Sequence, residues 1–566
     1  MTYYNTPISS RRERIALSVG QALLKARAAG AVDFSELPAF VVETPREVLH
    51  GDFATNAALL LSKTMRQNPR AVAETILTFF DAEAAGVAKA SIAGPGFINF
   101  HMPVLWQAQL LAEILAAKET YGASQVGAGV KIQVEFVSAN PTGELHMGNA
   151  RGAAIGDSLA SLLTLAGFDC QREYYINDFG NQIDKFGLSL EARYLQALGQ
   201  NVPFPEDGYY GEDLPLLMAE LVRESGDEYL ELTPQQRRQS LVKYALKRKL
   251  DDIRAALAGF GVSYDCWFSE QSLHESGAIN EVIDDLRSRG WLLEQQGALW
   301  LDCCRFGEEK PEVLVRGNGL PTYFAADIAY HKNKYERGFA TVINVWGADH
   351  HGHVARMQGA MEALGYRRER LEVILMQFVR LIEGGEILKM SKRTGTYVTL
   401  NELVEEVGRD AARFAFVMRS ADNLIDFDLD LAKQQTLKNP VYYVQYAYAR
   451  FCSILKAAMA EGLTLPKETL PEGQLAQLSH KSELLLIRRL ADFPDEVITA
   501  ALQREPHRIA TYVQEVASLF HNFYDQCRVL SPDKELSIAR LCLAFAAATV
   551  IKNSLQALGV SAPQKM

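Results

Sequence analysis

The residues best suited to chemistry lie in two glycine-containing segments that are far apart in the chain. The first segment holds His146, Gly148 and Asn149. A spacing of three places the imidazole and the carboxamide on one side of a helical turn, and Gly148 lets a flat group approach the backbone closely. Both side chains can donate hydrogen bonds to phosphate oxygens. A helix-capping loop with an incidental histidine would contain the same residues, so this segment alone leaves both interpretations open.

The second segment reads GGEILKMSKRTG over residues 384–395 and contains two lysines, Lys389 and Lys392, with Met390 and Ser391 between them. Two lysines in a loop bracketed by glycines suit the binding of a polyphosphate, although a solvated basic loop has the same composition. Neither segment fits the G-x-G-x-x-G or G-x-x-x-x-G-K-[ST] fingerprints of common nucleotide sites.

The elements around the first segment predict where it lies. Apolar and polar residues alternate from Ile132 to Phe136, which predicts a strand, and residues 138–143 (SANPTG) have the composition of a loop. Apolar residues at helical spacing from Ile155 to Leu163 then predict a helix, and residues 170–176 a second strand. In such a β-loop-α-β unit the loop lies at a helix N-terminus, where free N–H groups and the helix dipole hold phosphates.

Taken together, the two segments resemble the HIGH and KMSK signatures of class I aminoacyl-tRNA synthetases. The surrounding residues are similar to those of the arginyl-tRNA synthetases over nearly the whole chain, in residues 134–146, 321–330, 346–353, 408–414, 441–447 and 558–563. One departure is Asn149, where the general class I motif has a second histidine. An amide still donates a hydrogen bond to a phosphate or ribose oxygen, so we interpret Asn149 as a tolerated variant.

The resemblance implies an α/β fold with three parts. These are a class I Rossmann-like parallel-sheet catalytic domain, an N-terminal α+β domain that contacts tRNA, and a C-terminal all-α helix bundle of the DALR type that binds the anticodon. It also implies ATP-dependent ligation of L-arginine to the 3' end of tRNA(Arg) through an arginyl-adenylate, with release of AMP and pyrophosphate, for use in translation. ATP is expected with Mg²⁺, and we expect a monomer.

The resemblance assigns roles to individual residues. Those expected to act on the phosphates are His146, Asn149, Lys389 and Lys392, and further ATP contacts are expected from Gly148, His350, Met390 and Ser391. Contacts with tRNA are expected from Asn56 in the segment HGDFATN, from Tyr443 and from Met566.

Recognition of arginine requires carboxylates, because a guanidinium forms strong and geometrically selective bidentate pairs with them. The candidates are Asp327, Glu270 and Asp349. By resemblance, Asp327 with Tyr323 binds the guanidinium, Glu270 assists, and the amino acid's backbone groups are held by Ser138 and Asn140. Each acid could instead be a structural ion-pair partner, and for Asp349 that interpretation carries nearly equal weight.

Changes in pattern along the chain predict the domain boundaries. We expect an N-terminal domain over 1–110, a catalytic domain over 122–400 with a helical insertion at about 187–249, a connecting segment over 401–435, and a helix bundle over 436–566. A strand pair broken by Gly-Pro-Gly is expected over 91–101, a helix over 57–65, and a helical linker over 104–121. In the bundle, helices are expected over 441–459, 474–493, 506–526 and 537–558. The charged runs of the insertion are typical of solvated helix faces.

The amino-acid composition is that of an ordinary globular protein and excludes a uniformly basic surface and a membrane-spanning protein. The chain is 48% hydrophobic and 22% charged with a net charge of −11, as expected for a globular protein without a uniformly basic surface. Its seven cysteines show no metal-ligand spacing, which predicts reduced thiols and no structural metal. A metal cluster of His350, His351 and His353 is a weaker interpretation than substrate contacts. We find no targeting segment or membrane-spanning run, so we expect a cytoplasmic protein.

Three other functions compete with arginine ligation. The chain could be a class I synthetase for lysine, cysteine or glutamate, which amino-acid-specific activation would distinguish. It could be a cytidylyltransferase-like enzyme, against which the C-terminal helices argue. It could also be a non-catalytic RNA-binding paralogue, although His146, Lys389 and Lys392 are all present.

Overall fold

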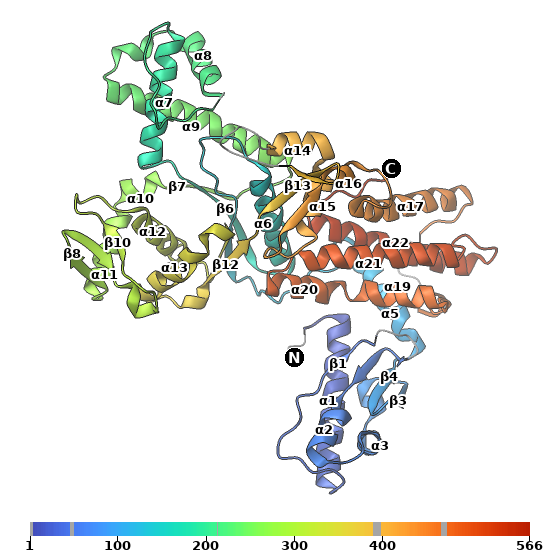
Figure 1. Ribbon diagram of the computed structural model, residues 1–566. Coiled ribbons are helices and arrows are strands. Elements are labelled where there is room, and N and C mark those ends of the chain that lie inside the picture. Colours follow the sequence, from blue (N-terminus) through green and yellow to red (C-terminus); the bar gives the residue numbers. More distant parts are fainter. Residues whose placement is uncertain (1–3, 46–49, 212, 389–397, 466–471) are drawn as a thin grey trace.

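The computed structural model describes residues 4–45, 50–211, 213–388, 398–465 and 472–566. The lysines of the second signature segment, Lys389 and Lys392, and the intervening Met390 and Ser391 lie outside the described residues. The chain forms an elongated molecule in which the N-terminal domain, the insertion and the C-terminal bundle extend from a central sheet (Figure 1).

The N-terminal domain is a four-stranded antiparallel sheet covered by helices. The sheet order is β1-β2-β4-β3, with bounds Val42–Glu43, Phe53–Thr55, Phe97–His101 and Lys89–Ala93. The helices are α1 (Pro7–Ala28), α2 (Ala57–Met65), α3 (Pro69–Phe79) and α4 (Ala82–Ala85). The strand pair at the Gly-Pro-Gly turn and the helix at Ala57–Met65 were both expected from the sequence. Helix α5 (Val104–Ala117) then leads into the centre of the molecule.

A five-stranded parallel sheet forms the catalytic domain, in the order β12-β11-β5-β6-β7. Its strands are β5 (Lys131–Glu135), β6 (Asp169–Ile176), β7 (Cys266–Ser269), β11 (Thr341–Gly347) and β12 (Leu371–Met376). The chain builds outward from β5 in one direction and later returns on its other side with β11. Ligands bind at such a switch point, outside the carboxyl ends of the strands.

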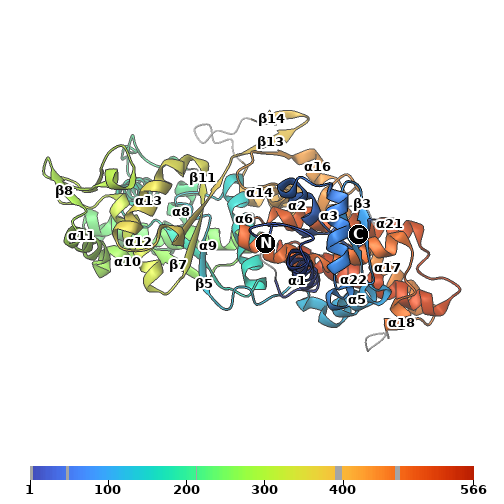
Figure 2. The ribbon, with the colours of Figure 1, turned by 90° about the horizontal axis from the view of Figure 1, so that it is seen from below.

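Helices cover both faces of this sheet. Helix α6 (Met147–Leu165) lies on one face, and α12 (Tyr323–Glu336) and α13 (His351–Ala363) lie on the other (Figures 1 and 2). Almost all of α6 is buried because it also packs against α15 and α20. A Cβ at Gly156 would lie 2.2 Å from the ring of Phe136, so only glycine permits this approach of helix to sheet.

Two further units interrupt the sheet. The insertion contains α7 (Asn181–Ala197), α8 (Asp213–Ser225) and α9 (Pro234–Gly259) around a small core of its own. The second unit holds α10 (Gln271–Ser276), α11 (Ala278–Ser288) and an antiparallel sheet of order β10-β9-β8, whose bounds are Glu312–Val315, Ala298–Leu301 and Leu292–Gln295. The sequence analysis did not predict this second unit.

The chain beyond β12 forms a small sheet on either side of the second signature segment. Its order is β14-β13-β15, with bounds Glu386–Leu388, Val379–Glu383 and Ile425–Asp428, and β15 runs parallel to β13. The accompanying helices are α14 (Leu400–Val407), α15 (Arg409–Val417) and α16 (Leu429–Lys433). Part of residues 401–435, the predicted connecting segment, therefore packs against β13, which precedes it in the chain.

The C-terminal part is a helix bundle, as the sequence predicts. Its helices are α17 (Pro440–Ala460), α18 (Glu472–Leu475), α19 (Lys481–Ala491), α20 (Phe493–Gln503), α21 (His507–Gln526) and α22 (Lys534–Ala557). We expected one helix over residues 474–493, but α19 begins only at Lys481, where the His480 side chain caps it, and α20 follows as a separate helix. Among the described helices, none combines the length and apolar character needed to cross a bilayer.

Candidate active site

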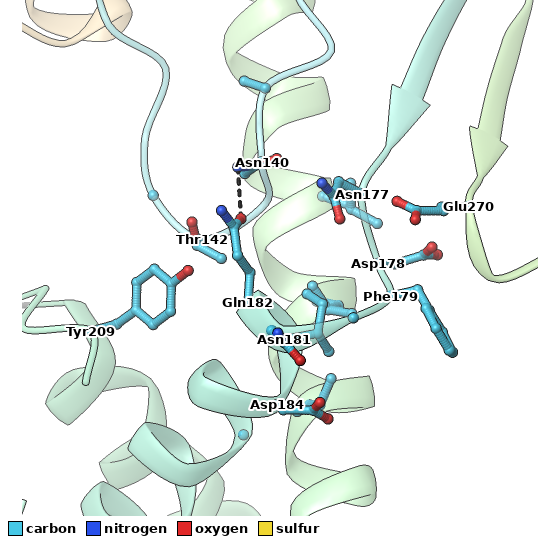
Figure 3. Close-up of a pocket in the computed structure, with 18 of the residues that line it drawn as sticks. Asn140, Thr142, Asn177, Asp178, Phe179, Asn181, Gln182, Asp184, Tyr209 and Glu270 are labelled. Carbon is cyan, nitrogen blue, oxygen red and sulfur yellow. Dashed lines mark hydrogen bonds between the residues drawn. The ribbon is translucent and has the colours of Figure 1, made fainter. Parts of the chain in front are cut away.

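A cleft of about 3110 Å³ opens at the carboxyl ends of the central strands, between the catalytic sheet and the insertion. The loop after β5 and the N-terminus of α6 form one wall, and α7 and α9 form the opposite wall. Residues of the loops after β6 and β7 also line it, among them Asn177, Asp178 and Glu270 (Figure 3). The cleft therefore lies where an open parallel sheet binds its ligands.

His146 and Asn149 together cap the helix whose N-terminus faces the cleft. His146 Nδ1 accepts a hydrogen bond from the Gly148 amide at 3.1 Å, and Asn149 Oδ1 accepts one from the His146 amide at 3.1 Å. A neutral imidazole that accepts at Nδ1 carries its proton on Nε2. The capping role and the phosphate-binding role use different atoms, because capping uses acceptor atoms and a hydrogen bond to a phosphate would use donor atoms.

The chain that follows the second signature segment contacts this helix N-terminus. Thr399, two residues after the last residue outside the described part, forms an antiparallel bridge with His146. The next amide, Leu400 N, donates to Leu145 O at 2.8 Å. Thr399 and Glu402 line the same cleft as His146 and Asn149. Segments more than two hundred residues apart in sequence thus converge on one helix N-terminus, as a shared triphosphate site requires.

The loop after β5 holds Ser138 in an unusual backbone conformation. Val137 has φ of 70° and Ser138 has φ of 42°, in the left-handed region that β-branched residues rarely adopt. The Ser138 hydroxyl donates to Glu135 Oε1 at 2.9 Å and accepts from the Tyr175 amide at 3.1 Å. Such strain persists only where surrounding contacts impose it, and it is concentrated at functional sites.

Asn140 faces the cleft from the same loop. Its amide donates to Gln182 Oε1 of α7 at 2.9 Å (Figure 3). Tyr209 of the insertion approaches Thr142, also on this loop (Figure 3). The insertion is therefore in direct contact with the loop that we expect to hold the amino acid.

Two buried carboxyl groups lie at or beside the cleft: Glu270 lines it, and Asp327 lies on α12 between the lining residue Tyr323 and the following turn. Glu270 is 4% exposed and Asp327 is 7% exposed. Among the described residues, their ion-pair partners are histidines: His353 Nε2 lies 3.1 Å from Asp327 Oδ2, and His274 Nε2 lies 3.7 Å from Glu270 Oε1. Buried carboxylates without an arginine or lysine partner are suited to receiving a cationic ligand.

The surroundings raise the pKa of both acids. Burial, followed by the neighbouring Asp327 and Asp178, raises the pKa of Glu270 to about 7. Burial raises the pKa of Asp327 as well, opposed by its hydrogen bond with His353. The Asp327 carboxylate is the main cause that raises the pKa of Tyr323, which hydrogen-bonds to it. Tyr323 and Asp327 therefore face one another, and their role in binding a guanidinium stays a prediction.

The remaining candidates are more exposed. The Asp349 side chain is 64% exposed and lies 3.7 Å from His350, and His350 lines the cleft. Of the three neighbouring histidines, His353 contacts Asp327. Within the described residues, no group of three or more His, Cys, Asp or Glu side chains has an arrangement that could hold a metal ion.

Comparison with known proteins agrees with this geometry. The family described as "tRNA synthetases class I (R), catalytic domain" matches residues 110–437, the "Arginyl tRNA synthetase N terminal domain" matches 13–102, and the "DALR anticodon binding domain" matches 444–566. The chain belongs to the arginyl-tRNA synthetase family. The "Arginine--tRNA ligase" of Heliobacterium modesticaldum is 58% identical over 99% of this chain and 100% of its own, and that of Moorella thermoacetica is 57% identical with the same coverage. The arginyl-tRNA synthetase structure from Thermus thermophilus has the same fold, with a TM-score of 0.74, 24% identity and coverage of 98% and 100%.

The residues that the resemblance assigns to tRNA contacts in this synthetase lie in three different places. Asn56 Oδ1 accepts a hydrogen bond from the Val41 amide at 3.0 Å in the N-terminal domain. The Tyr443 ring packs edge-on against His521 on the bundle, with ring centroids 4.9 Å apart. Met566 is 47% exposed at the end of the chain. Their roles stay predictions.

Several cleft residues of the synthetase were missed by the sequence analysis. Helix α9 contributes basic side chains to the cleft wall, namely Arg238, Lys243, Lys247 and Arg254, and Phe179, Leu188, Tyr210, Leu216 and Leu320 contribute exposed apolar surface. We interpreted the charges of the insertion as solvated faces, which is correct for Arg248 with its partners Glu220 and Glu224. The periodicity of the sequence does not show which charged side chains of α9 line the cleft and which pair with neighbouring helices.

Proposed function

We propose that this cleft joins L-arginine to ATP and then transfers the arginyl group to the 3' end of tRNA(Arg). The observation that supports this proposal is that His146, Asn149 and Thr399 line the same cleft as the buried carboxyl group of Glu270, which has the buried Asp327 as its neighbour. A phosphate-binding helix terminus on one side and an acceptor for a cation on the other match the two ends of an arginine that is attacking ATP. The same architecture suits no acidic or apolar amino acid, because the buried carboxylates would then stay unpaired.

In the first step, the arginine carboxylate attacks the α-phosphate of ATP and pyrophosphate leaves. Phosphoryl transfer depends on positioning and on neutralising charge more than on a base. His146 Nε2–H and the Asn149 amide would donate to phosphate oxygens at the N-terminus of α6, with Gly148 and His350 beside the nucleotide. Lys389 and Lys392, with Met390 and Ser391, would act on the leaving pyrophosphate. Mg²⁺ would enter with the nucleotide as MgATP, because Mg²⁺ binds substrate phosphates and keeps several waters.

The arginine substrate would span the cleft from the loop after β5 to helix α12. Ser138 and Asn140 would hold its α-amino and carboxylate groups. Asp327 and Tyr323 would pair with the guanidinium, assisted by Glu270. Asp349, which is largely exposed, would contribute less, because exposed ion pairs are weak.

In the second step, the terminal adenosine hydroxyl of tRNA attacks the carbonyl carbon of the arginyl-adenylate, an ester forms, and AMP leaves. The 3' end would reach it along the wall formed by α9, where cationic and apolar side chains alternate. Single-stranded nucleic acid binds to such surfaces through phosphate contacts and base stacking. On the bundle, the parallel rings of Tyr442 and Tyr446, with Arg450 over Tyr446, offer a similar surface for anticodon bases. Asn56, Tyr443 and Met566 would add contacts with tRNA.

The deciding experiment is tRNA charging by the purified chain with each amino acid in turn. We expect arginine alone to be attached, in a reaction that requires ATP. Efficient charging with lysine, cysteine or glutamate would overturn the assignment, and the absence of any turnover would favour a non-catalytic RNA-binding protein. We further propose a cytoplasmic monomer, for which sedimentation should give the mass of one 62.9 kDa chain.

The affinity for arginine should increase with pH through neutrality. Because burial raises the pKa of Glu270 to about 7, the carboxyl group is largely protonated at lower pH and must lose its proton to pair with a guanidinium. The arginine KM should therefore fall severalfold between about pH 6 and pH 8 and level off above that. Glu270→Gln should remove this dependence, measured by ATP–pyrophosphate exchange with saturating tRNA. A KM for arginine with the same pH profile in both proteins would contradict the role of Glu270.

The basic wall of α9 should contribute to tRNA affinity only. Lys243 and Lys247 are exposed, lie one helical turn apart and line the cleft. Lys243→Ala combined with Lys247→Ala should raise the tRNA KM about tenfold, because each phosphate contact adds to affinity in a salt-dependent way, and should leave the arginine KM unchanged. Arg248→Ala is the matched control, because Arg248 does not line the cleft and pairs with Glu220 and Glu224 of α8, and it should change neither value. An unaltered tRNA KM in the double variant would show that the 3' end follows another path.

A further inference from the structure

A chain of buried polar side chains runs behind the arginine site, on the face of the sheet that α12 covers. Its central member is Lys334, whose side chain is fully buried. Lys334 Nζ lies 2.5 Å from Glu135 Oε2 and donates to Asn344 Oδ1 at 3.0 Å. A lysine is rarely placed in such a position, because burying its charge is costly unless a carboxylate compensates for it.

On one side, this series of buried side chains leads to the loop that we expect to hold the backbone groups of arginine. Glu135 binds Lys334 through one carboxylate oxygen and Ser138 Oγ through the other. Ser138 and the preceding Val137 have the positive φ values described above. The Glu135 carboxylate therefore helps to hold the loop in a conformation that it would not adopt alone.

On the other side, the series leads to the helix that carries Asp327. The Asn344 amide nitrogen contacts His331 Nε2 at 2.7 Å, and His331 Nδ1 contacts the Asp327 carbonyl at 2.8 Å. Burial and the nearby Lys334 lower the pKa of His331, so its ring is neutral. The neutral ring then donates from Nδ1 to the carbonyl and accepts at Nε2 from the amide. Every contact on this side is thus a hydrogen bond with a defined direction.

We propose that Lys334 is a positioning residue that fixes the distance between the loop at Ser138 and helix α12 at Asp327. These two points would hold opposite ends of the amino acid, so their separation would set the side-chain length that the site accepts. The proposal rests on the function proposed above. Lys334 touches neither substrate in this arrangement and acts only through Glu135 and Asn344.

A purely structural role for Lys334 makes a different prediction. Removing one partner of a buried ion pair destabilises a protein because the other charge stays buried and unpaired. That effect would lower the amount of folded enzyme but would change all substrates alike. A positioning role instead alters the arginine KM and the discrimination between arginine and longer or shorter analogues, since a displacement of about 1 Å in a substrate contact can cost about 10²-fold.

The test compares Lys334→Met with the double variant Glu135→Gln/Lys334→Met. The single variant should show a lower melting temperature and an arginine KM raised about 10–100-fold, with the ATP KM within about twofold of the wild type. The double variant contains no unpaired buried charge, so its melting temperature should recover. Its arginine KM should stay raised, and its preference for arginine over homoarginine, which has one more methylene, should be weakened. An arginine KM that recovers together with the melting temperature would overturn the proposal.

Arg337→Met provides the matched control. Arg337 caps the same helix and pairs with Glu173, which is fully buried on β6, but neither residue has a hydrogen bond with the loop at Ser138. This variant should lose stability and keep an arginine KM within about twofold of the wild type. An equal rise in both variants would show that general loosening of α12 is responsible, and would overturn the specific role of Lys334. Failure of the wild-type chain to activate arginine at all would refute the proposed function instead.

Discussion

Replacing Asp327 by asparagine should reduce kcat/KM for arginine by about three orders of magnitude. Truncating one partner of a buried, hydrogen-bonded charge pair costs about 2–5 kcal/mol, and the expected partner here is a guanidinium that would lie within reach of both Asp327 and Tyr323. Asparagine has nearly the same shape and can still accept the hydrogen bond from His353, so the fold should persist. The measurement is ATP–pyrophosphate exchange with saturating tRNA at a series of arginine concentrations.

The ATP KM and the melting temperature of this variant should stay close to those of the wild type. Asp284→Asn, which removes an exposed carboxylate paired with Arg287 on α11, is the matched control and should be without effect. Asp349→Asn tests whether Asp349, instead of Asp327, is the carboxylate that pairs with the guanidinium. A large loss at Asp349 together with an unchanged arginine KM at Asp327 would move the guanidinium site to the loop after β11.

Local patterns in the sequence predict the elements that present the phosphate-binding groups. The alternation from Ile132 to Phe136 and the helical spacing from Ile155 to Leu163 match β5 and α6, because the apolar residues follow the period of each element even though both elements are buried on more than one face. The Ala57–Met65 helix has the predicted bounds for the same reason. Where an element is long and amphipathic, its own residues carry the information.

Short elements that depend on distant partners could not be predicted in this way. Strands β8, β9 and β10 have four residues each and are paired only with one another, so their hydrophobic pattern is too brief to detect. The division between α19 and α20 has a similar cause. Apolar residues continue through Phe493, and the break depends on Pro494 and on packing against neighbouring helices.

In the site, too, some features leave a local sequence pattern, whereas features that depend on distant contacts do not. His146 and Asn149 were identified because their spacing and their neighbours are distinctive, whereas their reciprocal capping bonds were not predicted. Lys334 appears in the sequence as an ordinary lysine on a helix, and only its burial against Glu135 distinguishes it. Nothing in the sequence predicts the left-handed conformation of Val137, because a β-branched residue intrinsically prefers extended structure.

Helix α9 links the regions that bind different parts of the substrates. Leu241 belongs to the core of the insertion, and Ile253 and Leu257 belong to the main core, so one continuous helix is packed into both. A tRNA end bound along Lys243 and Lys247 would therefore act on a rigid element that reaches the catalytic domain. The contact between Asn140 and Gln182 gives the insertion a second connection to the arginine loop.

The second large effect is expected for Lys392, which lies outside the described residues. Lys392→Ala should lower kcat for ATP–pyrophosphate exchange by about 10²–10³-fold, the typical cost of losing one group that stabilises charge in the transition state. The tRNA affinity should change little, because the charge that Lys392 would neutralise grows only as pyrophosphate leaves. Lys310→Ala, an exposed lysine near β10, is the control and should leave both values unchanged. The described chain supports this expectation, since it returns to His146 at Thr399 directly after this segment. Equal losses in exchange rate and in tRNA affinity would show instead that Lys392 contributes to tRNA binding and not to the departure of pyrophosphate.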